Sequence, residues 1–366
     1  MRTLIEHVPI PIAGVALGLA ALGNLLAPAA EAAHMACGAL STALVALLIA
    51  KIVLFPAQIR DDLRNSILAS VSATLFMTLM QLSAYLAPLA YPPAFMLWAF
   101  AVVAHLALMI GFTVRFMARF ELREVFPTYF ICYVGIIVAS ATSPAFGMEA
   151  VGHALFWMGF ALYLVMLALV TYRYAKHEIP EPARPLFCIY TAPASLSIVG
   201  YLATAAEPSP LFVGILLVLA QALFLIVLAR LPRLLRLRFY PSFAAMTFPF
   251  VITATALGQA AAFLEAADQA LPAFLPAFAD ALIAVETGIA VALVAYVLAR
   301  YAVFLLGHLE LPARGAAGES ALLARLANRF EREHADAQPA EAVAGDVTPR
   351  FPARGPVSAY ALRHPR

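Results

Sequence analysis

The chain has 366 residues, of which 64% are hydrophobic and only 12% are charged, and its mean hydropathy is +0.89. A soluble globular domain carries about 25% charged residues, so the composition excludes an ordinary soluble domain and indicates an integral membrane protein. The formal net charge of +2 says little, because the basic residues are segregated along the chain.

Apolar segments follow one another from the start of the chain to about residue 304. A helix needs about 20 apolar residues to cross a bilayer core, and ten segments meet this need. They are 8–30, 32–50, two spans within 65–114 separated by a turn at Tyr91, Pro92 and Pro93, 125–148, 150–172, 185–206, 208–229, 239–264 and 278–304. The opening residues, MRTLIEHVPIP, contain no small-residue cleavage site, so we expect no removable signal peptide.

All 23 Lys and Arg residues fall on one side of this map. They lie before segment 1 (Arg2), after segment 2 (Lys51, Arg60, Arg64), after segment 4 (Arg115, Arg119, Arg123), after segment 6 (Arg173, Lys176, Arg184), after segment 8 (Arg230, Arg233, Arg236, Arg238) and from Arg300 onward. Basic residues stay on the cytoplasmic side of inserted segments. The pattern predicts ten spans in the inner (plasma) membrane with both termini in the cytoplasm.

The odd-numbered segments differ in amino-acid composition from the even-numbered ones. They carry helix-breaking or small polar residues, among them Pro9, Pro11, Gly14 and Gly18 in segment 1, Ser72 in segment 3, Gly135 in segment 5, Pro193 in segment 7 and Pro249 in segment 9. Such residues are tolerated where a membrane helix faces protein or a water-filled cavity. We therefore expect five hairpins with the odd helices inside and the even helices facing lipid. The alternative is that small residues only allow close packing.

Few side chains in the apolar segments offer chemistry. Cys37, Cys132 and Cys188 form no CxxC pair and are expected to be buried side chains. His105 is expected to be a hydrogen-bonded packing residue, with a proton-relay role as the alternative. Glu286 is an intramembrane acid, a default functional candidate, although its place near the outer end also suits a structural role. No enzymatic motif stands out, so we expect no catalytic residues, metal or cofactor.

From residue 311 the composition becomes rich in Arg, Glu, Ala and Pro. We expect a transmembrane domain over 1–310 and a mostly disordered cytoplasmic tail over 311–366. Within the tail, 319–334 is amphipathic. It is expected either to lie on the anionic inner leaflet or to form a solvated helix or coiled-coil contact.

Four stretches in the odd segments resemble a known family. They are GVALGLAAL at 14–22, FPTYFICYVGIIVASA at 126–141, TAPA at 191–194 and FAAMTFP at 243–249. Their order and spacing are similar to those of the tellurite-resistance/C4-dicarboxylate transporter family, whose members include TehA-like bacterial proteins and plant slow anion channels. The resemblance implies a homotrimer with a pore in each subunit, inside a quasi-fivefold ring of odd helices.

The resemblance also implies a Phe from segment 9 that plugs the pore. The match places Phe248 at this plug, with Phe243 and Phe250 as competitors. Family members carry kinking prolines where this chain has Ala16, Ser72 and Cys132, whereas Pro193 is kept and Pro249 replaces a Gly. The pore-lining or kink candidates are Gly14, Gly18, Ser72, Cys132, Gly135, Pro193 and Pro249.

The odd segments contain hydroxyls and amides such as Gln81 and Gln259 but no dedicated charged site. This lining suits ions that enter and leave readily, and it predicts a gated anion channel or channel-like exporter for small inorganic anions such as chloride or nitrate. The first alternative is a proton-coupled carrier for C4-dicarboxylates, or for sulfite or tellurite. The second is an intramembrane enzyme. It would require a cluster of catalytic residues, and the sequence contains only the isolated candidates His105 and Glu286. No nucleic-acid partner is expected.

Overall fold

The computed structural model describes residues 2–267 and 274–308. This part of the chain is helical and contains no strand. Its α-helices are α1 Arg2–Glu6, α2 Ile12–Leu26, α3 Glu31–Leu54, α4 Pro56–Asp62, α5 Ser66–Val71, α6 Ala73–Leu86, α7 Tyr91–Phe112, α8 Thr128–Val134, α9 Ile137–Thr142, α10 Glu149–Lys176, α11 Ala192–Thr204, α12 Pro210–Leu235, α13 Phe248–Ala267 and α14 Phe274–Leu306. Other helical pieces are the π-helix η1 Thr113–Met117 and the 3-10 helices η2 Leu122–Glu124, η3 Ser143–Phe146, η4 Glu181–Thr191 and η5 Pro241–Met246. The tail 311–366, the amphipathic stretch 319–334 and Asp268 lie outside the described residues.

Within the described residues, eight helical stretches are long and apolar enough to cross a membrane, and the bent pair α8 and α9 makes a ninth. The chain is thus an all-α membrane protein, as the sequence predicts. The first expected span, 8–30, is wrong in length, because α2 has only 15 residues. Pro9 and Pro11 precede it in a turn in which the Ile12 amide donates to the Pro9 carbonyl, and Pro28 follows its end. Proline cannot continue a helix in either place without losing a backbone hydrogen bond.

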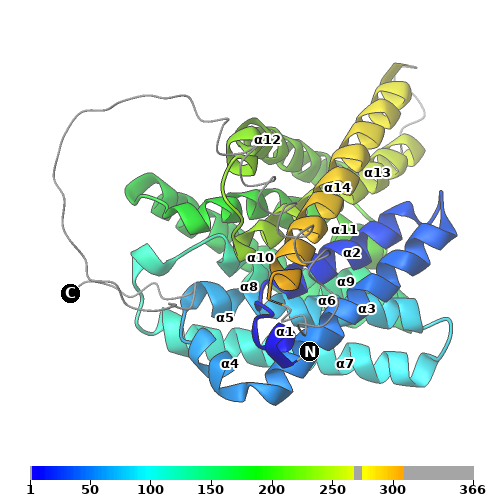
Figure 1. Ribbon diagram of the computed structural model, residues 1–366. Helices are drawn as coiled ribbons and strands as arrows, with labels where there is room; N and C mark the ends of the chain where they lie inside the picture. Colours follow the sequence, from blue (N-terminus) through cyan, green and yellow to red (C-terminus); the bar gives the residue numbers. More distant parts are fainter. Residues whose placement is uncertain (1, 268–273, 309–366) are drawn as a thin grey trace, which may run out of the picture. The chain divides into compact units, whose positions relative to one another are not determined.

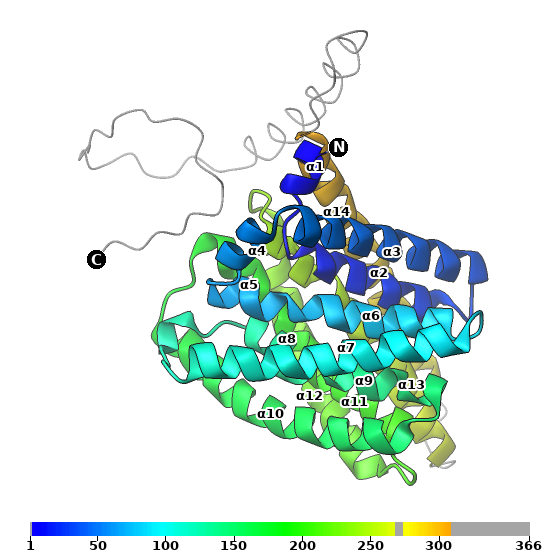
Figure 2. The ribbon, with the colours of Figure 1, turned by 90° about the horizontal axis from the view of Figure 1, so that it is seen from below.

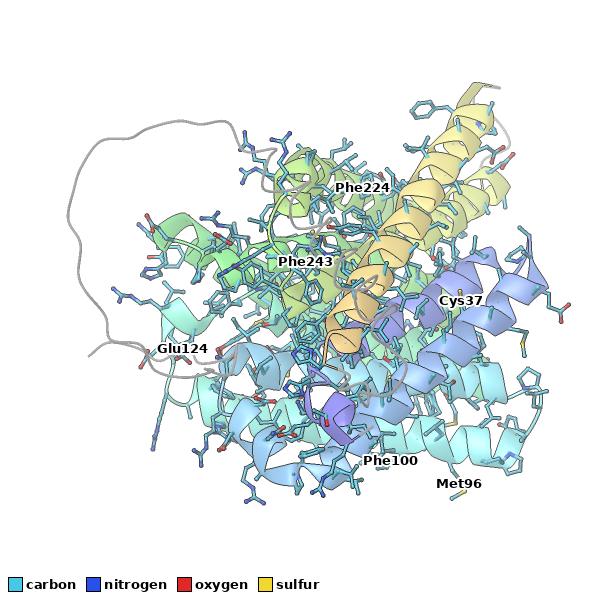
Figure 3. The ribbon with its side chains drawn as sticks, in the orientation of Figure 1. Cys37, Met96, Phe100, Glu124, Phe224 and Phe243 are labelled. Atoms are coloured by element: carbon cyan, nitrogen blue, oxygen red, sulfur yellow. The ribbon has the colours of Figure 1, made fainter. Side chains whose placement is uncertain are left out.

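The odd-numbered segments are buried and the even-numbered ones are exposed. Three odd segments, Ser66–Leu86, Glu181–Thr204 and Pro241–Ala267, bury 56%, 83% and 61% of their most apolar 18-residue stretch. The five even helices α3, α7, α10, α12 and α14 bury only 28% to 33%. On α7, for example, Met96 and Phe100 project away from the bundle (Figure 3). Large apolar side chains exposed on this scale are suited to a lipid environment rather than to water.

Helix continuity follows the same division. Each even segment contains one long α-helix of at least 22 residues. Four of the five odd segments are interrupted, at Ser72 between α5 and α6, at Gly135 and Ile136 between α8 and α9, at the change from η4 to α11, and at Thr247 between η5 and α13. The first odd segment contains the single short helix α2. The axis bends by 51° between α8 and the stretch that begins with α9. The interrupted segments are the ones enclosed by other helices.

We call α2, α5 with α6, α8 with α9, η4 with α11, and η5 with α13 the inner segments of the described chain. Their main helices contact one another in the closed order α2, α6, α9, α11, α13 and back to α2. Each outer helix packs over two neighbouring inner segments: α3 on α2 and α6, α7 on α6 and α8, α10 on α9 and α11, α12 on α11 and α13, and α14 on α13 and α2. Figure 1 shows α14 lying along α13, and Figure 2 shows α3, α2, α6 and α7 running side by side.

Glycines allow the inner segments to pack closely around Ile137. A Cβ atom at Gly200 of α11 would lie 2.4 Å from Cγ2 of Ile137, and one at Gly159 of α10 would lie 2.5 Å from Cγ1 of the same side chain. Such distances are too short for real contacts, so α9 can approach α10 and α11 this closely only while both positions are Gly. By contrast, a Cβ at Gly214 of α12 would meet no atom within 4 Å.

We predict that Gly200→Ala lowers the free energy of unfolding by about 1–3 kcal/mol, because the added methyl group overpacks a tight site. Gly214→Ala is the matched control. It should be neutral or slightly stabilising, because the site is open and Ala favours the helix. Thermal unfolding of the detergent-solubilised protein measures both. Equal unfolding temperatures for the two variants would contradict the packing described for Ile137.

Candidate functional site

One face of α13 leads from the buried interior to an open end. Phe248, Ile252, Thr255, Gln259 and Ala262 recur at the spacing of one helical face. Phe248 and Ile252 are 5% and 3% exposed, Thr255 is half-buried, and Gln259 and Ala262 are exposed. The side chains on this face are therefore buried at Phe248 and become more exposed toward the C-terminal end of the helix.

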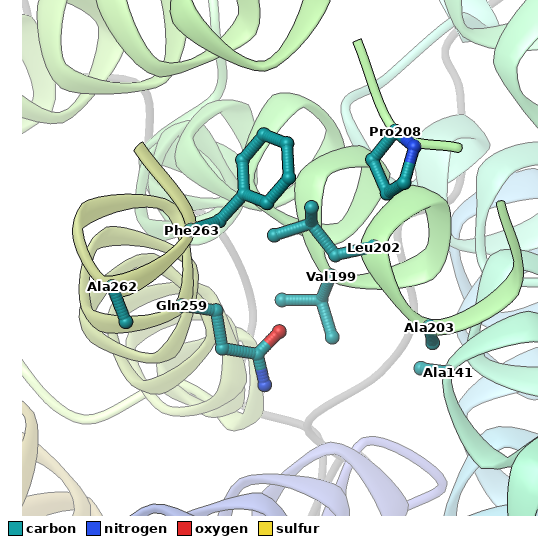
Figure 4. A pocket seen from close by; sticks show the side chains of 8 residues that line it. All are labelled: Ala141, Val199, Leu202, Ala203, Pro208, Gln259, Ala262 and Phe263. Atoms are coloured by element: carbon teal, nitrogen blue, oxygen red, sulfur yellow. The ribbon is translucent and has the colours of Figure 1, made fainter. Parts of the chain in front are cut away.

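The open end of that face lines a cavity of about 440 Å³. Its walls come from the C-terminal parts of three inner segments, α9, α11 and α13 (Figure 4). The lining side chains are those of Ala141, Val199, Leu202, Ala203, Pro208, Gln259, Ala262 and Phe263. Gln259 supplies the only polar side chain among them, and its amide lies within the hollow (Figure 4). The cavity is therefore lined by apolar side chains, and among them only the Gln259 amide can donate a hydrogen bond.

The three candidate Phe residues differ in what their rings contact. The Phe243 ring lies 5.7 Å from the Phe239 ring and 6.4 Å from that of Tyr296 in α14. The Phe250 ring lies 5.8 Å from that of Phe224 in α12. Both therefore face the outer layer, and Phe243 and Phe224 are seen there in Figure 3. Phe250 is two residues from Phe248, which on a helix is about 200° of rotation, so the Phe248 ring faces away from α12.

Gly14 and Gly18 do not interrupt α2, which runs through both positions. They are positions of close contact between helices. A Cβ atom at Gly14 would lie 3.3 Å from Cβ of Ala244, and one at Gly18 would lie 2.5 Å from Cβ of Thr247. Both glycines thus let α2 approach the junction of η5 and α13, directly before Phe248.

Pro193 and Pro249 stand in the first turn of α11 and of α13. Proline is well tolerated there because the first amides of a helix have no intrahelical partner. Each proline follows a change from 3-10 to α geometry, so it marks the start of a helix rather than a bend within one. Both are buried.

Ser72, Cys132 and Gly135 lie at or beside the breaks in segments 3 and 5. The Ser72 hydroxyl donates to the Ala69 carbonyl at 2.7 Å. Cys132 is a buried free thiol, and its carbonyl accepts a hydrogen bond of 3.0 Å from Nε2 of His105. A Cβ at Gly135 would lie 2.2 Å from the Ile131 carbonyl oxygen and 2.6 Å from Sδ of Met77, so the bend has this close packing only because Gly135 has no side chain. Cε1 of His105 is also near, at 3.2 Å from that Cβ.

Several hydroxyls of the inner segments join one inner segment to the next. Ser70 donates to Thr128 at 2.8 Å, Thr78 lies 3.1 Å from the Ala13 carbonyl, and Ser195 donates to Thr253 at 3.2 Å. Such bonds satisfy buried polar groups within the bundle. The sequence suggested hydroxyls that contact ions, but these particular groups have protein partners.

Glu286 is 1% exposed although it belongs to an outer helix. It lies on the buried stripe of α14 that continues through Ala290, Val294 and Val297. Gln221 of α12 interacts with it electrostatically, yet neither carboxylate oxygen makes a hydrogen bond of ordinary geometry to a described residue. Glu286 therefore points into the protein, toward Gln221 of α12, and not to lipid.

At the basic end of the bundle, Lys51 anchors the start of segment 1. Its ammonium donates to the Val8 carbonyl at 2.7 Å and lies 4.0 Å from the Asp62 carboxylate. Burial raises the pKa of Asp62, and the Lys51 charge opposes that rise. The Val8 carbonyl precedes the Pro9–Pro11 turn, so Lys51 satisfies a backbone acceptor in a stretch that has few amide donors.

The comparison of the chain with protein families gives a match to the voltage-dependent anion channel family, SLAC1, over residues 7–303. The chain belongs to this family. The family resemblance expected from the odd segments is thereby confirmed, and with it the coarse function, which is the passage of anions across a membrane. A comparison with curated proteins finds no match.

Sequence reasoning overlooked one residue of this region. Thr247 appeared only as a letter of the family motif, because nothing in its spacing distinguishes it from the many other hydroxyl residues of the odd segments. The proline two residues later, which predicts a helix start, was the available signal that Thr247 lies at a break.

We predict that His105→Leu destabilises the protein by about 1–3 kcal/mol, because the buried Cys132 carbonyl loses its donor. His105→Gln retains a donor and should retain most of the stability. Thermal unfolding of the two purified variants tests this. If the Gln variant is no more stable than the Leu variant, the hydrogen bond is not what His105 contributes.

Proposed function

We propose that this member of the family is a gated anion channel, or a channel-like exporter, for small inorganic anions such as chloride and nitrate. The observation that carries the proposal is the face of α13 whose side chains change from exposed at Gln259, beside the cavity, to buried at Phe248. At 1.5 Å per residue these two positions are roughly 16 Å apart along the helix. An anion path of this kind would be open at one end and closed by one ring.

The chemistry of the inner segments supports a channel over a dicarboxylate carrier. The stretches 12–26, 66–86, 128–146, 192–204 and 248–264 contain no Asp, Glu, Lys or Arg. A carrier that holds two carboxylates would be expected to present Arg or Lys to them. An apolar path with a few amides and hydroxyls gives weak contact and rapid release.

Phe248 is the proposed gate. A bulky apolar ring in a narrow apolar path blocks ions sterically, and a partly dehydrated anion finds no compensating donor beside it. Phe248 lacks the outer-layer ring contacts that Phe243 and Phe250 make, which favours it over both as the residue that faces the path.

We predict that Phe248→Ala markedly raises anion flux, because it removes the ring and leaves a wetter passage. Chloride or nitrate flux in liposomes, normalised to reconstituted protein, is the measurement. Phe243→Ala and Phe250→Ala are the matched controls. They should lose stability, at about 3–5 kcal/mol for a core Phe, without a gain in flux. A gain at position 243 or 250 alone would identify a different gate.

We further propose that the protein lies in the plasma membrane as a homotrimer, with both termini and the basic loops in the cytoplasm. The one-sided distribution of Lys and Arg supports this orientation. Glu207, between α11 and α12, would then be outside, and Lys176, at the end of α10, would be inside. Both residues are exposed.

Thiol labelling tests the orientation. In a background with the three native cysteines replaced by Ala, Glu207→Cys should react with a membrane-impermeant maleimide added to intact cells. Lys176→Cys should react only after permeabilisation. The reverse pattern would invert the topology.

A further inference from the structure

We propose that Thr247 is a positioning residue that couples the Phe248 ring to helix α2. This inference rests on the proposed function, because it concerns what holds the proposed gate closed. It assigns to α2 the role of the element whose contact with Thr247 sets the position of the ring.

Thr247 occupies the break between η5 and α13. Its backbone angles are φ −100° and ψ −90°, outside the α-helical region. Phe248 is the next residue and the first of α13. A change in the backbone of Thr247 therefore moves Phe248 directly, whereas a residue deeper in α13 is held by the hydrogen bonds of the helix.

The side chain of Thr247 joins this break to α2. Its hydroxyl oxygen lies 2.9 Å from the Gly14 carbonyl and 2.7 Å from the Ala244 carbonyl. The Ala244 contact stays within η5, whereas the Gly14 contact crosses to a segment more than 230 residues away in the sequence. Thr247 is fully buried, so bulk water does not compete with these two carbonyl groups for its hydroxyl.

Gly18 makes the approach of the two segments possible. A Cβ atom there would lie 2.5 Å from Cβ of Thr247, 2.7 Å from its hydroxyl oxygen and 3.0 Å from the amide nitrogen of Phe248. Gly14 and Gly18 are four residues apart, so both lie on one face of α2. That face of α2 packs against the backbone amide of Phe248 as well as against Thr247.

Neighbouring helices in turn hold α2. Ser41 of α3 donates to the Ala16 carbonyl at 2.7 Å, and the Thr78 hydroxyl of α6 lies 3.1 Å from the Ala13 carbonyl. The Thr247 hydroxyl thus binds to a helix that is fixed on two other sides. Loss of this bond frees the break while leaving the rest of α2 in place.

The test compares Thr247→Val, which keeps the branched shape and loses the hydroxyl, with Thr247→Ser, which keeps the hydroxyl. Chloride flux in liposomes, normalised to reconstituted protein, should rise roughly 2- to 10-fold for Val, the change in open population that one neutral hydrogen bond produces. Ser should stay close to the wild type. Thr247→Ala is the second variant if Val is poorly produced, and it should change flux in the same direction.

Thr78→Val is the matched control. Its hydroxyl also contacts a carbonyl of α2, but at Ala13 and not beside the proposed gate, and Ser41 still holds α2 in this variant. Its flux should therefore rise much less than that of Thr247→Val. A rise of the same size for Thr78→Val would mean that loosening α2 in general opens the path, and it would overturn the specific role of Thr247.

Combination with Phe248→Ala separates the inference from the proposed function. If Phe248→Ala does not raise flux, the proposed gate fails. If Phe248→Ala raises flux but Thr247→Val behaves like Thr247→Ser, the gate stands and the coupling through Thr247 is wrong. If the coupling is right, Thr247→Val adds nothing once the ring is absent. An equal rise in both backgrounds would show that Thr247 acts independently of the ring.

Discussion

The structure depends on one constraint, which is that every backbone N–H and C=O inside a bilayer needs a partner from the protein. A continuous helix meets this need by itself, and the five outer helices are continuous where they are most exposed. An interrupted helix cannot meet it alone. Four of the five inner segments of the described chain are interrupted, and they are found only where other helices cover them.

Side chains supply the partners that these interruptions remove. His105 reaches from α7 to the Cys132 carbonyl at the bend of segment 5, and Lys51 reaches from α3 to the Val8 carbonyl before α2. In both cases a side chain of an outer helix donates a hydrogen bond to a backbone carbonyl of an inner segment. The outer helices therefore face lipid and also satisfy backbone groups of the inner segments, which allows the inner backbone to depart from regular helix.

The sequence was a good guide to this division and a poor guide to its details. Segment order, the family and the buried character of the odd segments follow from charge placement and from Pro, Gly, Ser and Thr, because those residues have direct backbone consequences. The length of α2 was overestimated, because hydropathy does not register that Pro9 and Pro11 remove amide donors. The break near Cys132 lies at Gly135 and Ile136 and contains no proline.

The sequence alone did not predict which side chains pair across neighbouring helices. Composition could not predict that Glu286 turns inward to Gln221. In a membrane helix the side that faces lipid and the side that faces protein are both apolar, so hydropathy does not tell them apart. Nor could it predict that Thr247 meets Gly14, since the two are 233 residues apart in the sequence. These pairings depend on which helices become neighbours, and a single sequence carries no direct record of that.

The inner segments also share a direction. Gly14 lies opposite Ala244 and Gly18 opposite Thr247, while Thr253 meets Ser195 and Gln259 shares a cavity with Val199, so neighbouring segments advance together along the bundle. Each helix carries about half a positive charge at its beginning and half a negative charge at its end. The outer helices run back in the opposite direction, so their dipoles oppose those of the inner set and the bundle as a whole has little net dipole. Near the central axis, however, the inner helices are closest, and they present their positive ends on one side and their negative ends on the other. The two ends of a central path would therefore differ electrostatically for an anion.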